Sequence, residues 1–462
     1  MTPQQETICA ISTAPGIGGI AVIRVSGPDA IKVVASIWKG KSLQDAISHT
    51  AHLGYIIDPE TNETIDQCVA TVFRAPATFT GEDIIELSVH GSQWIQQETL
   101  RLLINTRQCR LAEAGEFTRR AFANGKIDLS QAEAIADVIA STTRASHRLA
   151  MSQMKGQYSK QINSLRNSLL ELACLLELEL DFSEEDVEFA SRQKLMDVAT
   201  EIKQSVTQMT DTFSIGKAIK EGIPVAIIGQ PNTGKSTLLN ALVGEERAIV
   251  SNIPGTTRDT IEDTTIINGI QYRFIDTAGL RDTTDTIEAI GIGRAMQTLS
   301  KAAIVIWLIT PETTQQEIDA TAGKIISAIK ADTHLIVCIN KTDVPHPASR
   351  QTVPPELPHT MLHISALTGT GLSELKNELH KLYSADNLIQ PHLVVTNARH
   401  YQALTQAAES IGRVIDGLAV NLPGDLIAQD VRETIHHLGE ITGAITSPDI
   451  LSTIFSRFCI GK

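Results

Sequence analysis

Residues 229–236 read GQPNTGKS, and this octapeptide decides the fold of the chain around it. It matches GxxxxGK[ST], in which glycines let backbone N–H groups turn towards phosphate oxygens and the next helix adds its positive N-terminus. An apolar run at 224–228 (PVAII) precedes it and a helical run at 237–243 follows. This order predicts a P-loop, in which Lys235 reaches the β- and γ-phosphates and Ser236 binds Mg²⁺. A glycine turn with a chance lysine is the alternative.

The chain beyond this loop alternates strand-like and helical runs. The strand-like runs lie at 272–275, 302–309, 335–339 and 361–364. Such alternation is typical of βαβ units and predicts a mainly parallel sheet with helices on its faces.

Two further motifs follow at strand or loop positions suited to a nucleoside triphosphate. Residues 254–259 (PGTTRD) supply Thr257, which we expect to close over the γ-phosphate and complete the Mg²⁺ shell. Residues 276–279 (DTAG) end a predicted strand. Asp276 can therefore hold a metal-bound water while the Gly279 N–H faces the γ-phosphate.

A fourth motif selects the base. Residues 340–343 (NKTD) follow a predicted strand, and the Asp343 carboxylate can accept hydrogen bonds from both N1–H and the 2-amino group of guanine. Adenine offers no such pair of donors. Asn340 and the stem of Lys341 would brace the loop and the ring, and residues 365–367 (SAL) fit a backbone contact to guanine O6. The predicted nucleotides are GTP and GDP.

Hydrolysis needs a group that orients water, and position 280 is Leu where Ras-type GTPases place a glutamine. Glu288, in the acidic stretch that follows, is the best polar candidate, although a solvated surface acid is the alternative. The predicted catalytic residues are Lys235 and Glu288. The predicted GTP-binding set comprises Asn232, Thr233, Gly234, Lys235, Ser236, Thr237, Ser251, Thr256, Thr257, Asp276, Thr277, Ala278, Gly279, Asn340, Lys341, Asp343, Ser365, Ala366 and Leu367.

The chain of 462 residues is long enough for about three domains. Residues 1–122 mix short alternating runs with turns and predict an α+β domain. Strand signals vanish in 123–214, and helical periodicity returns in 387–462, so the α/β domain at 215–386 is expected to be an insertion into an all-helical domain.

Composition limits the function classes. Hydrophobic residues make up 42% of the chain and charged residues 20%, which is typical of a soluble protein. No apolar run is long enough to cross a bilayer and no secretion signal opens the chain, so we expect a cytoplasmic protein without membrane contact. The formal charge of −14 argues against broad electrostatic binding of nucleic acid, so such a partner must meet a local basic patch or a second protein.

Over its whole length the sequence resembles the MnmE (TrmE) family of tRNA-modification GTPases, of the TrmE-Era-Septin type. The GTPase motifs are shared by many families, but the other motifs are specific. They are residues 13–16 (TAPG), 79–86 (FTGEDIIE), 115–120 (GEFTRR), 121–133 (AFANGKIDLSQAE) and the terminal 458–462 (FCIGK). The resemblance implies a folate-binding, dimer-forming N-terminal domain beside the helical and G domains.

For the G domain, the resemblance implies K⁺-dependent hydrolysis in a homodimer whose nucleotide faces meet. The residues that match the family's K⁺ ligands are Asn232, Ser251, Ile253 and Thr256, and Glu288 matches its water-orienting glutamate. A cation beside the β/γ bridge neutralises developing charge much as an arginine does.

For the N-terminal domain, the resemblance implies binding of 5-formyltetrahydrofolate, a stand-in for the donor methylenetetrahydrofolate. The matching residues are Arg24, Glu86, Lys126 and the terminal Lys462, whose charges suit a pterin amide and a polyglutamate tail. Taken singly, each could be an ordinary surface ion-pair residue.

The family acts with an FAD-dependent partner, MnmG, to attach an aminomethyl or carboxymethylaminomethyl group to C5 of the wobble uridine of certain tRNAs. Cys459 could attack uridine C6 or be a structural thiol. A GTP-switched ribosome-assembly factor is the alternative function, and such factors lack the N-terminal motifs and the FCIGK end.

Overall fold

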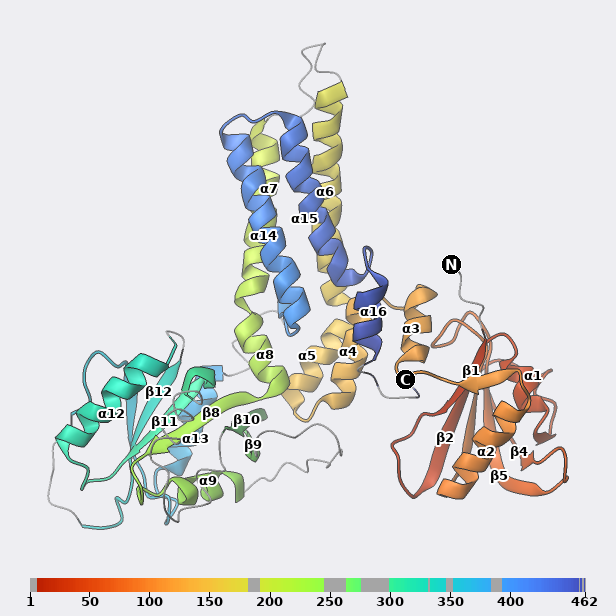
Figure 1. Ribbon diagram of the computed structural model, residues 1–462, viewed down its shortest axis with the longest axis horizontal. Helices are drawn as coiled ribbons and strands as arrows, with labels where there is room; N and C mark the ends of the chain where they lie inside the picture. Colours follow the sequence, from red (N-terminus) through yellow and green to blue (C-terminus); the bar gives the residue numbers. More distant parts are fainter. Residues whose placement is uncertain are drawn as a thin grey trace. The chain divides into compact units, whose positions relative to one another are not determined.

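The computed structural model describes residues 6–181, 192–244, 263–275, 299–330, 333–345, 352–383 and 393–456, with Phe458 and Gly461 (Figure 1). The chain forms two compact units. The first comprises Met1–Ala136, Gln153–Thr200 and Glu409–Lys462, and the second comprises Asp137–Ser152 and Glu201–Ala408.

The first unit begins with a sheet in the order β3-β4-β5-β6-β2-β1-β7. Its neighbours pair antiparallel except β1 and β7, which are parallel. Buried side chains alternate with more exposed ones along β5, because successive side chains of a strand point to opposite faces. Helices α1 and α2 contribute to the buried core on one face. The elements are β1 (Thr7–Ile11), β2 (Gly18–Ser26), α1 (Ala30–Ala35), β3 (Trp38–Gly40), β4 (Thr50–Ile57), β5 (Thr64–Phe73), β6 (Ile84–Gly91), α2 (Gln93–Asn105), β7 (Cys109–Leu111) and α3 (Glu116–Ala123).

The all-helical part is assembled from two separate segments of the chain. In the first unit α6 packs along α15, and the buried hydroxyls of Ser410 and Thr434 hydrogen-bond at 2.8 Å between α14 and α15. Helix α16 begins at an N-cap serine, Ser447, whose side chain accepts from the Ile450 N–H. The helices are α4 (Leu129–Ala140), α5 (Arg144–Met154), α6 (Gln157–Asp181), α7 (Arg192–Asp211), α14 (Ala398–Ala419), α15 (Gly424–Thr442) and α16 (Pro448–Phe455).

The second unit contains a sheet in the order β13-β12-β11-β8-β10-β9, parallel except for β9. Every residue of β11 is buried, as expected for a strand covered on both faces. Helices α9 and α13 pack on one face and α12 on the other. The elements are α8 (Phe213–Glu221), β8 (Ile223–Gly229), α9 (Lys235–Gly244), β9 (Asp263–Ile267), β10 (Ile270–Phe274), β11 (Ile304–Ile309), α12 (Gln315–Ala328), β12 (His334–Ile339), β13 (His359–His363) and α13 (Leu372–Tyr383).

This architecture confirms the predicted fold class. After β8 the chain forms β9 and β10 on one side of that strand and then β11 on the other side, so the strand order reverses at β8. In open α/β sheets ligands bind beyond the carboxyl ends of the strands at such a reversal. The loop after β8 is therefore at the position where a ligand site is expected.

Among the helices that the structure describes, none combines the length and the apolar character needed to span a membrane.

Candidate functional site

In the loop between β8 and α9, the Lys235 side chain hydrogen-bonds to the backbone of the loop itself. Lys235 Nζ donates to the carbonyl oxygens of Gly229 at 3.0 Å and Gln230 at 2.8 Å, and the buried Thr233 hydroxyl donates to the Gln230 carbonyl at 2.8 Å. Burial lowers the pKa of Lys235. The loop thus holds a partly desolvated ammonium beside backbone oxygens that hold it more weakly than phosphate oxygens would.

Left-handed backbone conformations at two positions bend this loop. Gly234 has φ +95°, and a β-carbon there would collide with Asn340 Nδ2. Asn232 has φ +64°, a conformation that asparagine tolerates better than most residues. The glycine at 234 is therefore needed both for the bend and for the close approach of the Asn340 side chain.

Asn340 ties the phosphate loop to the loop beyond β13. Its side chain is 3% exposed; Nδ2 donates to the Thr233 carbonyl at 2.8 Å, and Oδ1 accepts from the Ala366 N–H at 2.9 Å. Both hydrogen bonds are buried, so breaking either leaves an unsatisfied polar group. The predicted bracing role of Asn340 thus has a definite geometry, which joins the loops after β8, β12 and β13.

The residues predicted to read the base follow β12 and β13, which are adjacent parallel strands. Lys341 has φ +67°, and the exposed Asp343 follows two residues later. Ser365 is buried in a turn in which its N–H donates to the Thr370 carbonyl at 2.9 Å. Leu367 is 79% exposed, so only its main chain could contribute to binding the base.

Several predicted site residues lie outside the described part of the chain. They are Ser251, Ile253, Thr256, Thr257, Asp276, Thr277, Ala278, Gly279, Glu288, Cys459 and Lys462. Of the predicted metal ligands, the described ones are Ser236, partly buried in the first turn of α9, and the exposed Asn232. A hydroxyl and an amide oxygen are hard oxygen donors that suit Mg²⁺ and K⁺.

In the N-terminal domain the structure brings Arg24 and Glu86 together. They are directly opposite each other on β2 and β6. Arg24 Nε donates to Glu86 Oε1 at 2.9 Å, and Arg24 Nη2 lies 2.7 Å from the same oxygen as an ion pair. The guanidinium carbon lies 5.6 Å from the ring centroids of both Phe79 and Phe117. A partly exposed ion pair beside a partly exposed aromatic ring suits a flat, polar heterocycle such as a pterin.

Lys126, between α3 and α4, contacts the loop that carries Phe79. Its Nζ donates to the Pro76 carbonyl at 2.8 Å, and the Asn124 side-chain amide donates to the Thr80 carbonyl at 2.7 Å. Three of the four predicted folate residues are therefore tied to the β2–β6 pair or to the loop that leads into β6, and the fourth, Lys462, is outside the described residues.

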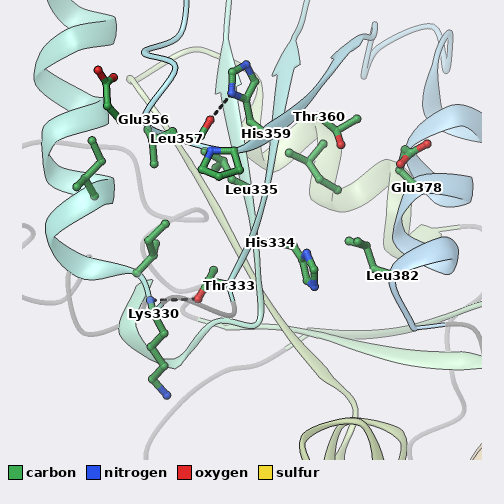
Figure 2. Close-up of a pocket in the computed structure, with 14 residues that line it drawn as sticks. Lys330, Thr333, His334, Leu335, Glu356, Leu357, His359, Thr360, Glu378 and Leu382 are labelled. Carbon is green, nitrogen blue, oxygen red and sulfur yellow. Dashed lines mark hydrogen bonds between the residues drawn. The ribbon is translucent and has the colours of Figure 1, made fainter.

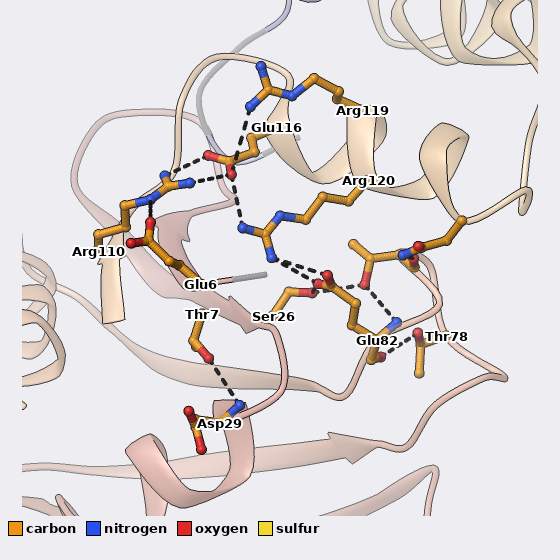
Figure 3. Close-up of polar contacts among 12 residues, drawn as sticks. Glu6, Thr7, Ser26, Asp29, Thr78, Glu82, Arg110, Glu116, Arg119 and Arg120 are labelled. Carbon is orange, nitrogen blue, oxygen red and sulfur yellow. Dashed lines mark hydrogen bonds and ion pairs between the residues drawn. The ribbon is translucent and has the colours of Figure 1, made fainter. Parts of the chain in front are cut away.

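Figure 3 shows a buried ion-pair network that sequence reasoning missed. Glu116, 2% exposed, accepts from Arg110 at 2.7 and 2.8 Å and from Arg120 at 2.9 Å. Arg120 also donates to Glu82 at 3.1 Å, and Ser26 donates to the same carboxylate at 2.8 Å. The network joins α3 to the loop before β6. The charged residues in GEFTRR and FTGED were a possible signal, but spacing alone does not pair them.

A cavity of about 550 Å³ lies elsewhere in the second unit (Figure 2). Its lining includes His334 and His359, which begin β12 and β13, together with Glu378 of α13. These are the amino ends of the strands, opposite to the nucleotide loops at the carboxyl ends. The cavity is therefore separate from the predicted nucleotide site.

Two family matches cover most of the chain. Residues 129–459 match the family described as "MnmE helical domain", and residues 7–126 match "GTP-binding protein TrmE N-terminus". The chain belongs to the MnmE (TrmE) family. This assignment confirms the resemblance inferred from the sequence motifs.

Full-length relatives agree with the MnmE assignment. A protein of Parabacteroides distasonis named "tRNA modification GTPase MnmE" is 50% identical over 464 residues, covering 99% of this chain and 100% of the relative. Proteins of the same name from Christiangramia forsetii and Cytophaga hutchinsonii are 48% identical over 474 residues and 45% identical over 462 residues. The alignments cover 99% and 100% of this chain and 99% of each relative. As a member of the MnmE family, the chain is a GTP hydrolase.

Proposed function

We propose that this chain uses K⁺-dependent GTP hydrolysis to drive modification of the wobble uridine of certain tRNAs. The observation that carries the proposal is the buried Asn340 bridge between phosphate loop and base loop, in a chain similar over its full length to proteins named tRNA modification GTPases. The bridge supports nucleotide binding, and the similarity supports the tRNA substrate.

At the nucleotide, Lys235 exchanges its two carbonyl partners for β- and γ-phosphate oxygens. This exchange is favourable because a charge-assisted bond to phosphate is stronger than a bond to a neutral carbonyl. Ser236 and Thr257 would hold Mg²⁺, which neutralises phosphate charge when bound. Asp276 and Gly279 would contact the γ-phosphate side, and Asp343 reads the guanine edge.

Catalysis needs a cation that neutralises charge and a group that orients the attacking water. The apolar side chain of Leu280 cannot orient water, so another residue must do so. Asn232, Ser251, Ile253 and Thr256 would hold K⁺, which stabilises the charge that develops near the β/γ bridge when it is bound. Glu288 would accept a hydrogen bond from the attacking water and so fix its direction. The exposed position and left-handed backbone of Asn232 support this role, because its side chain is accessible at the loop surface.

For the one-carbon donor, we propose a tetrahydrofolate bound at the Arg24–Glu86 pair. Both the Arg24 hydrogen bond and the ion-pair contact go to Oε1 of Glu86, so Oε2 would accept from a pterin N–H. Lys126 and Lys462 would attract the carboxylates of a glutamate tail. Cys459 could act as nucleophile on the uridine or serve only as a structural thiol.

The proposed assembly is a cytoplasmic homodimer working with the FAD-dependent subunit MnmG and with tRNA. The test is nucleoside analysis of tRNA from cells depleted of this protein and complemented with wild type or with Lys235→Ala. We expect the C5 wobble modification to be lost on depletion and restored by wild type only. Unchanged wobble uridines together with accumulated ribosomal precursors would instead support an assembly factor.

A further inference from the structure

Residues 138–170 contain no aspartate or glutamate, although the chain has 53 acidic residues among 462, about one in nine. The same stretch carries six basic side chains: Arg144, His147, Arg148, Lys155, Lys160 and Arg166. In a protein with a formal charge of −14, this is a local reversal of sign. We call these 33 residues the acid-free segment.

Helix α5 presents one cationic face to solvent. Its inner side carries Leu149 and Ala145, which pack with Ile219 of α8 in the second unit. Arg144, His147 and Arg148 are all exposed and lie at i, i+3 and i+4, so they share the opposite side of the helix. Within the described residues, no ion pair involves Arg144 or Arg148.

Acidic neighbours do not neutralise this face. Asp137, the acid that immediately precedes the acid-free segment, pairs with Lys220 of α8 at 2.8 Å. The next acid along the chain, Glu171, comes about three turns after Lys160 on α6. The acids that flank the acid-free segment in sequence therefore do not neutralise the α5 cations.

The start of α6, in the first unit, also carries exposed basic side chains and no acidic ones. Lys155 precedes the helix and Lys160 lies in its second turn; both are exposed. Tyr158 and Ile162 point into the core. Beyond residue 170 the helix becomes acidic, with Glu171, Glu177 and Glu179. The charge of α6 thus changes sign along its length.

We propose that the cationic outer face of α5, in the second unit, binds the phosphate backbone of tRNA, and that Lys155 and Lys160, in the first unit, make separate phosphate contacts of their own. Exposed Arg and Lys side chains without acidic partners are the groups that contact nucleic-acid phosphates. The inference rests on the proposed function for the identity of the polyanion. It explains how an acidic chain can bind RNA through a limited surface.

The test measures binding of an unmodified tRNA transcript to the full-length chain at several KCl concentrations. The variants are Arg144→Gln/Arg148→Gln and Lys155→Gln/Lys160→Gln. Each removed phosphate contact lowers the slope of log K against log salt by roughly 0.7–0.9, so each double variant should lower it by about 1.5. Affinity at low salt should fall by roughly tenfold or more.

The matched control is Lys324→Gln/Lys330→Gln, which removes the same formal charge from exposed positions in and just after α12. It should leave affinity and slope unchanged. Basal GTP turnover and the thermal unfolding midpoint of all variants should equal wild type, since none of these residues belongs to the nucleotide site.

Two outcomes overturn the proposal. If wild type and the α5 variant bind tRNA with the same salt slope, the RNA-binding surface lies elsewhere and the proposed function still stands. If that variant also fails to bind MnmG, the α5 face is a protein-binding surface instead. If wild type and the wild type–MnmG complex both fail to bind tRNA, the proposed function fails together with the surface.

Discussion

At the scale of single residues, Asn340 connects two parts of the proposed nucleotide site that are more than a hundred positions apart in sequence. Replacement by alanine would leave the buried Ala366 N–H and Thr233 carbonyl without their side-chain partner. We expect Asn340→Ala to lower the free energy of unfolding by about 2–4 kcal/mol and to weaken GDP binding. Urea denaturation and titration with labelled GDP measure both effects.

The control for that variant is Leu367→Ala, at a side chain that is 79% exposed. It should change neither stability nor GDP affinity, because only the main chain at this position could contact the base. Equal GDP affinity in Asn340→Ala and wild type would show that the two loops are positioned independently.

Asp343 determines the choice of base in our account. Asp343→Asn replaces a carboxylate acceptor by an amide that can also donate, so it should weaken GDP binding and favour xanthosine diphosphate, whose 2-oxo group accepts. Competition between the two nucleotides for the variant measures the switch. A variant that still prefers GDP would show that the base is read by other groups.

At the scale of elements, α3 is held to the N-terminal sheet through Glu116. Burial would raise the pKa of Glu116, but hydrogen bonds from Arg110, the Glu113 N–H and Arg120 outweigh it and lower the pKa to about 2, from 4.5. A carboxyl whose folded pKa is depressed stabilises the fold above its unfolded pKa. That stabilisation is lost as the pH falls from about 4.5 towards 2.

Glu116→Gln should therefore be less stable than wild type at pH 7, by on the order of 1–3 kcal/mol, and should lose less stability than wild type between pH 5 and pH 3. Urea unfolding at the three pH values tests this expectation. Glu113→Gln is the matched control, because Glu113 is exposed and pairs with the exposed Arg119. Parallel pH profiles for wild type and Glu116→Gln would contradict the network's role.

At the scale of the whole molecule, the proposed K⁺ site and the proposed dimer are linked, since nucleotide faces that meet would enclose the cation. Replacing K⁺ by Na⁺ at constant ionic strength should slow GTP turnover and reduce GTP-dependent dimerisation, with GDP affinity nearly unchanged. Turnover assays and analytical ultracentrifugation measure these effects. Equal turnover rates in the two salts would refute the K⁺ role.

The fold class was largely predictable from local pattern. The alternation of strand and helix runs around GQPNTGKS predicts the parallel sheet, and the loss of strand signals on both sides predicts the helical segments. Register and pairing were not predictable, because they depend on contacts between distant residues. The Arg24–Glu86 pair is an example: each residue alone is an ordinary charge, and the alignment of β2 with β6 brings them together.

By itself, the sequence determined the P-loop, the guanine-selective motif and the family, because these are carried by residue type at fixed local spacing. Only the tertiary structure decided how they are joined. The Asn340 bridge, the Glu116–Arg120–Glu82 network and the exposed cationic face of α5 arise where side chains from different elements meet or where packing leaves one face free. Local sequence does not encode those distances, since they are set by the packing of the whole domain.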